Sequence, residues 1–259
     1  MKKSLISILL LTSSISYGQV IIKEIREMDP IHKTLKYSFP LIIVPKNKKA
    51  SDKINNELAS DFLFIDRNKI NKSIFENVWS TKEIPIAIRS DISYKILSND
   101  KTLLNVSISA DGCGAYCEYF TEYYTFNIKT GERIILDSLL KVEGKQRLID
   151  SLNKKKREIL QMKLEQIKNT LKTQNAQMNV EEKEYYKEME TLYNECLDKK
   201  IRGLEYFKFY LSKSLLYLES NRCSAHYNRN LDEIGNFEFE LKPFEWKKYF
   251  TTYAIKILK

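Results

Sequence analysis

Residues 84–136 read IPIAIRSDISYKILSNDKTLLNVSISADGCGAYCEYFTEYYTFNIKTGERIIL, and this segment decides the fold class. Ile, Val, Tyr and Phe dominate three runs of it, and turn-forming residues bound each run, which is typical of β-strands. Asn99-Asp100-Lys101 and residues 129–132 (KTGE) predict hairpin turns. Gly131 is able to adopt the positive φ that such turns require. The segment therefore predicts a meander of antiparallel strands.

The residues before the meander predict a strand and two helices. Residues 33–44 (KTLKYSFPLIIV) mix aromatic and β-branched side chains, and Pro40 within them predicts an edge strand or a bulge. Ile54, Leu58 and Phe62 recur every four residues, which predicts an amphipathic helix with Ser51 as its N-cap. A second, shorter helical pattern covers residues 68–78.

Residues 141–200 predict a long helical hairpin. Apolar side chains recur with helical spacing at Leu160, Leu164, Ile167 and Leu171. After the polar break TQNAQMN, Asn179 and Glu182 form a capping-box pattern that begins a second helix. Residues 141–172 carry 10 basic and 4 acidic side chains, whereas residues 173–200 carry 4 basic and 7 acidic ones. Two such helices, folded back on one another, bring opposite charges together.

The hairpin also contains a basic run, residues 154–157 (KKKR). We interpret this run as a solvated helix face, with binding of an anionic polymer as the alternative.

After the hairpin the pattern returns to strands. Residues 203–220 predict a β-hairpin around Ser212-Lys213-Ser214, and FEFELKPFEW (237–246) alternates with period two. The C-terminal tail predicts a short helix or a final strand.

These elements together predict an α+β fold, in which an antiparallel meander packs with helices and a long helical hairpin is inserted. We expect a signal peptide over residues 1–18 and one α+β domain over residues 19–259. Within that domain, residues 19–140 form the strand, helix and meander part, 141–200 the helical hairpin, and 201–259 the C-terminal strands. About 241 residues suit one large domain or two small ones.

The N-terminus, MKKSLISILLLTSSISYGQ, has the layout of a secretory signal peptide. Lys2 and Lys3 form a basic start, an apolar stretch follows, and Ser16 and Gly18 precede a cleavage site before Gln19. The apolar stretch is shorter than the ~20 residues that span a bilayer. We therefore expect an exported protein, periplasmic or secreted, with no transmembrane segment after cleavage.

The charge balance is basic. The formal net charge of the precursor is +9, and removal of the signal peptide leaves +7. Such a balance favours an anionic partner, such as an acidic polymer or a membrane surface, or it serves only solubility. Export argues against nucleic acid as a partner.

Four cysteines remain after cleavage, namely Cys113, Cys117, Cys196 and Cys223. An even number in an oxidising compartment predicts two disulfides. Four cysteines allow three connectivities, and proximity in the sequence favours Cys113–Cys117 with Cys196–Cys223.

No motif identifies a reaction. A zinc site would need Cys113, Cys117, Cys223 and His226 to converge, and a redox pair would normally have C-x-x-C spacing. The G-x-S-x-G nucleophile motif and a glycine-rich phosphate loop are absent, and Ser224 is only a sequence neighbour of His226. We therefore expect no metal, no cofactor and no catalytic residues. Carboxylates or Ser and His residues that only the fold assembles would make a hydrolase, which is the alternative.

The aromatic run after Cys117 offers a candidate surface. Tyr119 and Tyr123 share one strand face, and the run is interpreted first as a core strand with a second face toward water or a helix. The alternative is a recognition strip, since tyrosine is favoured at binding surfaces. The candidate recognition residues are Gly112, Gly114, Tyr116, Tyr119 and Tyr123.

Several short phrases resemble an extracellular domain of unknown function that occurs in RsiV-type anti-sigma factors and in PdaC-type peptidoglycan deacetylases. The resemblance lies in NIKTG (127–131), the helix entry at Leu136, Asp137 and Leu139, the closing Pro243-Phe244, and the upstream FPLIIVPKNKKASDKINNEL (39–58). The chain departs from the family by carrying Cys113-Gly114-Ala115-Tyr116-Cys117 where relatives have a Gly-Gly-Ala-His-like loop. Its helical hairpin is also longer.

Neither a cytoplasmic anti-sigma segment nor a deacetylase domain is present in the sequence. The resemblance therefore implies a non-enzymatic binding domain of the bacterial cell envelope. Its partner would be a lysozyme-like protein, as in the anti-sigma relatives, or peptidoglycan.

Overall fold

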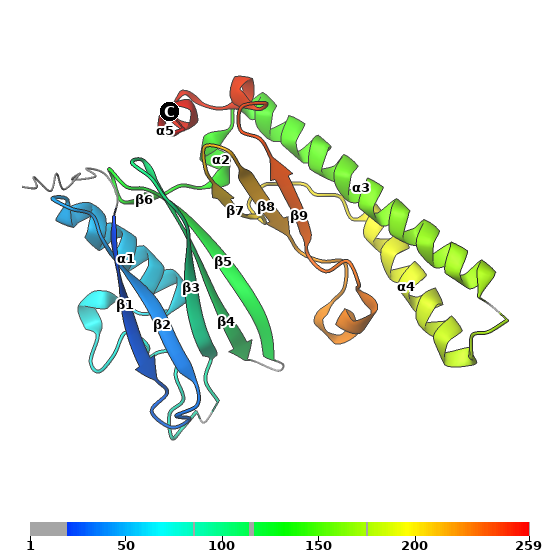
Figure 1. Cartoon of the computed structure of the whole chain (residues 1–259), viewed down its shortest axis with the longest axis horizontal. Helices are drawn as coiled ribbons and strands as arrows, with labels where there is room; N and C mark the ends of the chain where they lie inside the picture. Colours follow the sequence, from blue (N-terminus) through cyan, green and yellow to red (C-terminus); the bar gives the residue numbers. More distant parts are fainter. Residues whose placement is uncertain (1–19, 85, 114–116, 175, 259) are drawn as a thin grey trace, which may run out of the picture.

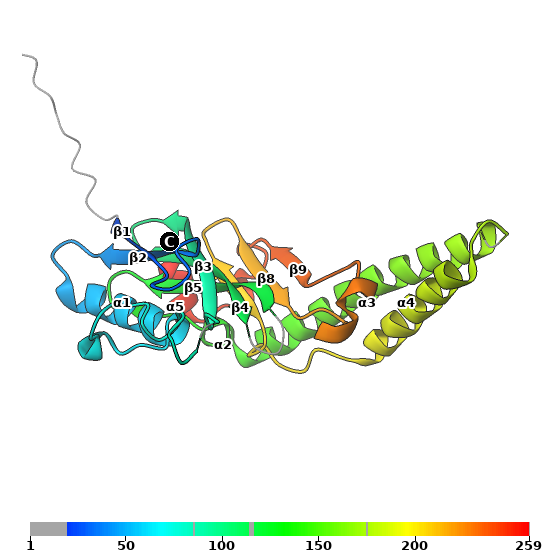
Figure 2. The same ribbon diagram turned by 90° about the horizontal axis from the view of Figure 1, so that it is seen from below.

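The computed structural model of the chain describes residues 20–84, 86–113, 117–174 and 176–258, without the side chains of Cys113, Cys117 and His226. These residues form two β-sheets, a helix against the first sheet and a helical hairpin that extends from the second (Figures 1 and 2). The predicted signal peptide and the loop residues Gly114 and Tyr116 lie outside the described residues. The predicted α+β class, with an antiparallel meander and an inserted helical hairpin, is confirmed.

The first sheet has six strands in the order β1-β2-β3-β4-β5-β6, all neighbours being antiparallel except β2 and β3. Its strands are β1 (Ile21–Met28), β2 (Lys36–Ile43), β3 (Arg89–Asn99), β4 (Leu103–Cys113), β5 (Cys117–Asn127) and β6 (Glu132–Arg133). The predicted meander is β3, β4 and β5. The pairing of β4 with β5 keeps one register from Leu103, opposite Asn127, to Cys113, opposite Cys117.

Helix α1 (Lys48–Phe62) packs on this sheet and closes the first core. The larger members of the first core are Tyr37, Phe39, Ile42, Ile54, Leu58, Phe62, Phe75, Val106, Ile108, Tyr124 and Phe126. Gly131 has φ +72°, as the turn between β5 and β6 requires, and a Cβ there would lie 2.5 Å from the carbonyl oxygen of Ala50. Only glycine therefore lets this turn approach α1 so closely.

Two buried polar side chains fix the backbone around the first core. Asn55 accepts a hydrogen bond from Ile42 N (2.8 Å) and donates one to Ile42 O (2.7 Å), so α1 is tied to β2. Asp29, which is fully buried, accepts hydrogen bonds from Ile31 N, His32 N, Ser80 N and Tyr37 Oη at 2.7–2.9 Å. The carboxylate thereby connects the turn after β1 to a loop some fifty residues later.

Several local expectations were wrong in this half. Strand β2 is not an edge strand, because the unexpected strand β1 pairs along its whole length. Pro40 is accommodated because β3 pairs with β2 at Tyr37 and not at Pro40, so no partner requires an N–H there. Asn47, not Ser51, is the N-cap of α1, and Ser51 Oγ instead accepts from Val44 N. Residues 68–78 form the short 3₁₀ helix η1 (Arg67–Lys69) and turns, not an α-helix.

The predicted helical hairpin consists of α3 (Val142–Thr173) and α4 (Val180–Asp198), which project as a long arm in both views (Figures 1 and 2). The predicted capping box is present: Asn179 Oδ1 accepts from Glu182 N, and Glu182 Oε2 accepts from Asn179 N. Opposite charges meet across the seam at Lys168 and Glu190, 3.8 Å apart. The residues facing the seam are Leu152, Leu160, Leu164 and Ile167 from α3 and Met189, Leu192, Tyr193 and Cys196 from α4.

The second sheet has three antiparallel strands in the order β7-β8-β9. They are β7 (Lys208–Leu211), β8 (Leu216–Ser220) and β9 (Phe237–Leu241), and the remaining short elements are α2 (Leu136–Leu139), η2 (His226–Leu231), η3 (Lys247–Tyr249) and α5 (Thr252–Ile257). The C-terminal tail is thus a short helix. A second core joins this sheet to the helical hairpin; it includes Leu148, Leu152, Leu160, Tyr193, Leu211, Leu218, Phe237, Phe239 and Phe250. Among the described residues, no helix is long and apolar enough to cross a membrane.

Candidate functional site

The two sheets meet where β7 lies beside β5, and we call this contact the joint. It is formed by Asn105, Tyr123, Lys208, Tyr210, Leu211 and Tyr217. The fully buried amide of Asn105 donates to Leu211 O (2.7 Å) and accepts from Leu211 N (3.3 Å), which ties β4 to β7. The joint is therefore polar and aromatic, between two apolar cores.

Three tyrosine rings pack at the joint. Tyr123 of β5 lies 5.6 Å from the ring of Tyr210 and 5.4 Å from that of Tyr217, and Tyr210 and Tyr217 stack 5.0 Å apart. Burial raises the pKa of Tyr217 above its ordinary value, and the nearby Glu219 adds to the effect. Tyr210 and Tyr217 thus cover a face of each other's ring, and the Tyr123 ring packs against both at a tilt.

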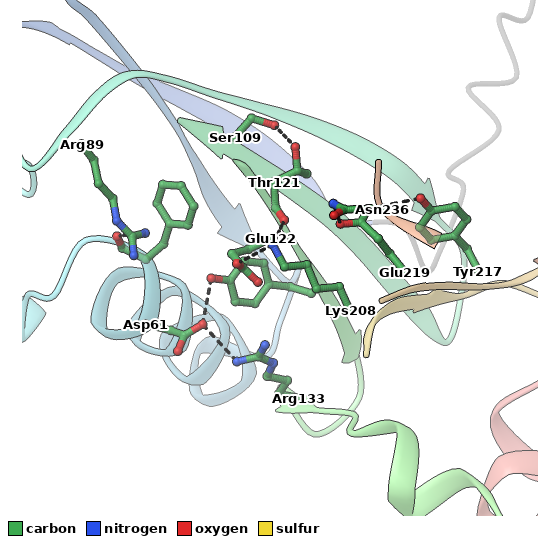
Figure 3. A network of polar contacts seen from close by, with 12 residues as sticks. Asp61, Arg89, Ser109, Thr121, Glu122, Arg133, Lys208, Tyr217, Glu219 and Asn236 are labelled. Atoms are coloured by element: carbon green, nitrogen blue, oxygen red, sulfur yellow. Dashed lines mark hydrogen bonds and ion pairs between the residues drawn. The ribbon is translucent and has the colours of Figure 1, made fainter. Parts of the chain in front are cut away.

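Lys208 bridges the sheets at the centre of the joint (Figure 3). Its ammonium donates to Thr121 O (2.7 Å), pairs with Glu122 Oε1 (2.9 Å) and lies 5.9 Å from the ring of Phe120. A cleft opens on either side of this lysine, and Lys208 lines both.

The first cleft, which we call the acidic cleft, has a volume of about 500 Å³. Its charged lining residues are Glu57, Glu122, Arg133, Asp137, Glu205 and Lys208, and its aromatic ones are Tyr123, Tyr206, Phe207 and Phe209. Four carboxylates against two cations make this cleft acidic in a basic chain. The ring of Tyr206 is 70% exposed at its rim.

Most carboxylates of the acidic cleft are already paired. Arg133 Nη1 lies 3.4 Å from Glu57 and 3.1 Å from Asp61, and Asp61 also accepts from Tyr124 Oη at 2.8 Å (Figure 3). Glu122 is paired with Lys208, as described above, and Asp137 lies 2.5 Å from the Lys145 ammonium. Glu57, Glu122 and Asp137 therefore each face a cation of the chain itself.

The second cleft, also about 500 Å³, is called the arginine cleft. Glu118 at the start of β5 lies 3.7 Å from Arg222 and 3.2 Å from Arg229. Tyr119, 59% exposed, stands at its edge. The hydroxyl of Ser224 also lines this cleft, and it has no hydrogen-bond partner among the described residues.

Glu219 of β8 is the buried carboxylate of the arginine cleft, 8% exposed. It accepts from Tyr217 Oη (3.3 Å) and Asn236 Nδ2 (3.0 Å), as Figure 3 shows. Burial raises its pKa above the ordinary value, although Lys208 and these two donors act in the opposite direction. A buried acid with a raised pKa in a cleft is a recognised sign of a functional site.

Arg89 is a second cation, besides Lys208, that lies close to the ring of Phe120. Its guanidinium lies 4.3 Å from the rings of Phe62 and Phe64 and 5.0 Å from that of Phe120, and it donates to Phe62 O. Burial lowers its pKa below the ordinary value. Since the aromatic rings and the carbonyl hold the cation, Arg89 connects α1 to β3 and β5.

The predicted recognition residues are only partly brought together. Tyr119 lines the arginine cleft, Tyr123 lines the acidic cleft, and Gly112 lies on β4 opposite Glu118. The backbones of Cys113 and Cys117 face each other at the end of β4 and β5, but their side chains lie outside the described residues, so that disulfide stays a prediction. Cys196 and Cys223, the other predicted pair, form a disulfide that joins α4 to the loop before η2.

Lys208, Arg133 and Glu219 were not expected at the site. Lys208 is a polar residue inside the apolar run YFKFYL, which was the one local sign of a special role. Its partners Thr121 and Glu122 lie more than eighty residues away in the sequence, so spacing alone gave no indication of them.

Of the four predicted zinc ligands, the structure describes the side chain of Cys223 alone. Cys223 is consumed by the disulfide with Cys196, and a disulfide sulfur lacks the thiolate charge that binds Zn²⁺. No group of three or more His, Cys, Asp or Glu side chains within the described part of the chain has the geometry of a metal site.

No protein-family model matches the chain, and no curated protein matches its sequence. Among solved structures, the chain is similar to a member of the DUF3298 family from Bacteroides fragilis, with a TM-score of 0.53 and 14% identity over 93% of this chain and 96% of that one. It is also similar to a DUF3298 family protein from Pseudomonas aeruginosa PAO1, with a TM-score of 0.48 and 9% identity over 91% and 95% of the two chains. The first likeness shows a shared fold.

Proposed function

We propose that the chain is an exported, non-enzymatic binding protein of the bacterial cell envelope, and that its ligand is a basic protein of the lysozyme type. The ligand docks on the acidic cleft, with Tyr206 and Glu205 at the rim of the contact. The resemblance to RsiV-type domains supports the choice of ligand, and the charged lining of the acidic cleft supports the place where it docks.

The charge of the acidic cleft is the observation that carries the proposal. The chain has a formal net charge of +9, yet its cleft presents four carboxylates against two cations. A local reversal of sign attracts a basic partner and orients it, since complementary charge increases the association rate and the specificity. Tyr206, exposed at the rim, belongs to the residue types that dominate binding energy at protein interfaces.

The tyrosine packing favours a protein ligand over a glycan. A sugar ring would stack on a free aromatic face, but Tyr210 and Tyr217 stack on each other and Tyr123 packs against both rings at the joint. Tyr119 and Tyr206 remain exposed, and they line different clefts. Two separated rings suit the scattered anchors of a protein interface better than a continuous sugar platform.

Two features support export. The N-terminal residues have the order of a secretory signal, and the chain contains the disulfide Cys196–Cys223, of a kind that persists in oxidising compartments. A binding protein in that compartment meets wall-associated proteins directly.

The test is a binding titration of the mature protein with a c-type lysozyme, followed by biolayer interferometry at low and physiological salt. We expect binding that weakens at least about tenfold in Tyr206→Ala with Glu205→Gln, because a rim anchor and one charge are lost. Tyr227→Ala is the matched control, since Tyr227 is 81% exposed and lies outside both clefts. Equal loss in the control, or no lysozyme binding by the unaltered protein, would overturn the proposal.

Glu219 supports a second candidate, an exported hydrolase of cell-wall material. Its raised pKa and its place in the arginine cleft are those of a general acid. Incubation of the protein with purified peptidoglycan separates the two functions. Release of soluble fragments that Glu219→Gln abolishes would establish the hydrolase, whereas retention of intact peptidoglycan or no reaction leaves binding as the function.

A further inference from the structure

A separate concave site lies on the helical hairpin, where the end of α4 meets the middle of α3. We call it the basic pocket; it has a volume of about 270 Å³ and is lined by Asp150, Asn153, Lys154, Lys156, Arg157, Leu160, Leu197, Lys199 and Lys200. Five of these side chains are cationic and one is anionic. The basic run on α3 therefore converges with two lysines that follow α4, which the sequence pattern of either helix alone does not indicate.

The charge of the basic pocket is largely uncompensated. Asp150 accepts a hydrogen bond from Gln146 Nε2 (2.9 Å), and Lys154 lies 3.9 Å from Glu158, which is outside the pocket. Among the described residues, Arg157, Lys199 and Lys200 make no ion pair. Several like charges around one concavity repel one another, so an anion that enters gains from all of them at once.

One lysine has a structural explanation, and the others do not. The ammonium of Lys156 donates to Lys199 O (2.8 Å) at the end of α4 and lies 5.2 Å from the ring of Phe237. A cation at a helix C-terminus is stabilising, so Lys156 acts as a cap there. Burial lowers the pKa of Lys156, and the charge of Lys199 lowers it further. Capping accounts for Lys156, and Lys154 pairs with Glu158, which leaves Arg157, Lys199 and Lys200 without a structural role for their charges.

We propose that the basic pocket binds a phosphate-type oxyanion, either free phosphate or a phosphate group of an anionic polymer. The guanidinium of Arg157 offers two parallel N–H donors to two oxygens, and the lysines act as point charges around them. The concave shape selects a compact group over a membrane surface, because a bilayer would contact only the rim. The inference is independent of the acidic cleft, which none of the pocket residues lines.

The test is isothermal titration of the mature protein with inorganic phosphate and with sodium polyphosphate, at low salt, against the double variant Arg157→Gln with Lys200→Gln. We expect the affinity for both anions to fall at least about tenfold, since two charge-assisted contacts are lost. The matched control is Lys155→Gln with Lys172→Gln. It removes the same number of positive charges, both of them from α3, but leaves every residue that lines the pocket intact.

The outcomes separate the possible sources of binding. Phosphate binding lost in the pocket variant and retained in the control supports the site. A preference for polyphosphate over phosphate identifies a polymer ligand, and equal binding per phosphate identifies the free anion. Equal losses in both double variants would mean that only diffuse charge attracts the anion, which overturns the proposal. Binding to phosphatidylglycerol vesicles without binding to phosphate would overturn it as well. Tyr206→Ala leaves phosphate binding unchanged, so failure here and failure of the lysozyme proposal are distinguishable.

Discussion

Two asparagines make the same contact in two different parts of the molecule. Asn55 pairs with both the N–H and the carbonyl of Ile42 inside the first core, and Asn105 pairs with both groups of Leu211 across the joint. The further partners differ: the amide of Asn55 also donates to the carbonyl of Ser51 on its own helix (2.8 Å), whereas hydroxyls of Ser98 and Thr125 bind the amide of Asn105. One amide fixes a helix within a core, and the other fixes two cores to each other.

Two buried carboxylates repeat this contrast. Asp29 receives four hydrogen bonds, which outweigh its burial and lower its pKa to about 2. Glu219 receives two from other side chains, and burial raises its pKa. Asp29 is thus fully compensated, whereas Glu219 is compensated only in part. The incompletely compensated carboxylate is the one that lines a cleft, the arginine cleft.

The asparagine comparison predicts the largest effect. Asn55→Ala leaves two buried backbone groups unpaired, at roughly 2 kcal/mol each, so we expect a loss of about 4 kcal/mol in the free energy of unfolding. For Asn105→Ala we expect about 2 kcal/mol, because the hydroxyls of Ser98 and Thr125 beside the amide replace part of the lost pairing. Urea unfolding measures both values.

Asn169→Ala, an exposed position on α3, is the control and should change stability by less than about 0.5 kcal/mol. A smaller loss for Asn55→Ala than for Asn105→Ala would contradict this ranking of the two contacts.

The disulfide tests whether the two cores unfold separately. It closes a loop across a sequence separation of 27, for which the loop-entropy relation gives about 3 to 4 kcal/mol. Cys196→Ser with Cys223→Ser should destabilise the second core, to which both cysteines belong, by that amount, and the first core should be less affected. Urea unfolding followed by hydrogen exchange resolves the two halves. Equal loss of protection in both would show that residues 19–259 unfold as one domain.

The sequence predicted elements that local chemistry determines. The meander was evident because each strand combines β-formers with turn residues at Asn99 and Gly131, and the helical hairpin because Asn179 and Glu182 cap its second helix. Strand β1 (IIKEIREM) was not predicted from the sequence. Its side chains are at most half-buried, so its apolar and charged residues do not alternate in the way that marks a single core face.

The candidate site was far less predictable. Tyr119 and Tyr123 were identified from their strand alone, but the clefts exist because β7 lies beside β5, a contact across more than eighty residues. Nothing near Asn105 in the sequence indicates that its amide meets Leu211, 106 residues later. Such contacts follow from how the two cores dock, and local periodicity carries no information about docking.

Asp29 gives a pH dependence with a definite sign. Its folded pKa of about 2 lies below the ordinary 3.8, so its hydrogen bonds stabilise the ionised form. The stabilisation, about 2 kcal/mol, is complete above pH 4 to 5 and is lost as the pH falls through about 2. Asp29→Asn should therefore be destabilised at pH 7 and should approach the unaltered protein near pH 2. Urea unfolding at several pH values checks this, and a constant difference at all pH values would contradict it.

Glu219 predicts the opposite sign and the smallest effect. Because its folded pKa is raised, the folded state disfavours ionisation, and stability should fall as the pH rises from 4.5 through that folded pKa. Glu219→Gln removes this cost while its amide oxygen still accepts from Asn236. We expect the melting temperature of the variant to exceed that of the unaltered protein by about 2 °C at pH 7 and to equal it at pH 4.

Glu240→Gln, an exposed change of the same charge on β9, should show no such pH dependence. If Glu219→Gln were instead less stable at pH 7, the Lys208 ammonium and the two hydrogen-bond donors would compensate Glu219 as fully as the four donors compensate Asp29. The joint would then be held together by its charges, and the raised pKa that favours a general acid in the arginine cleft would no longer apply.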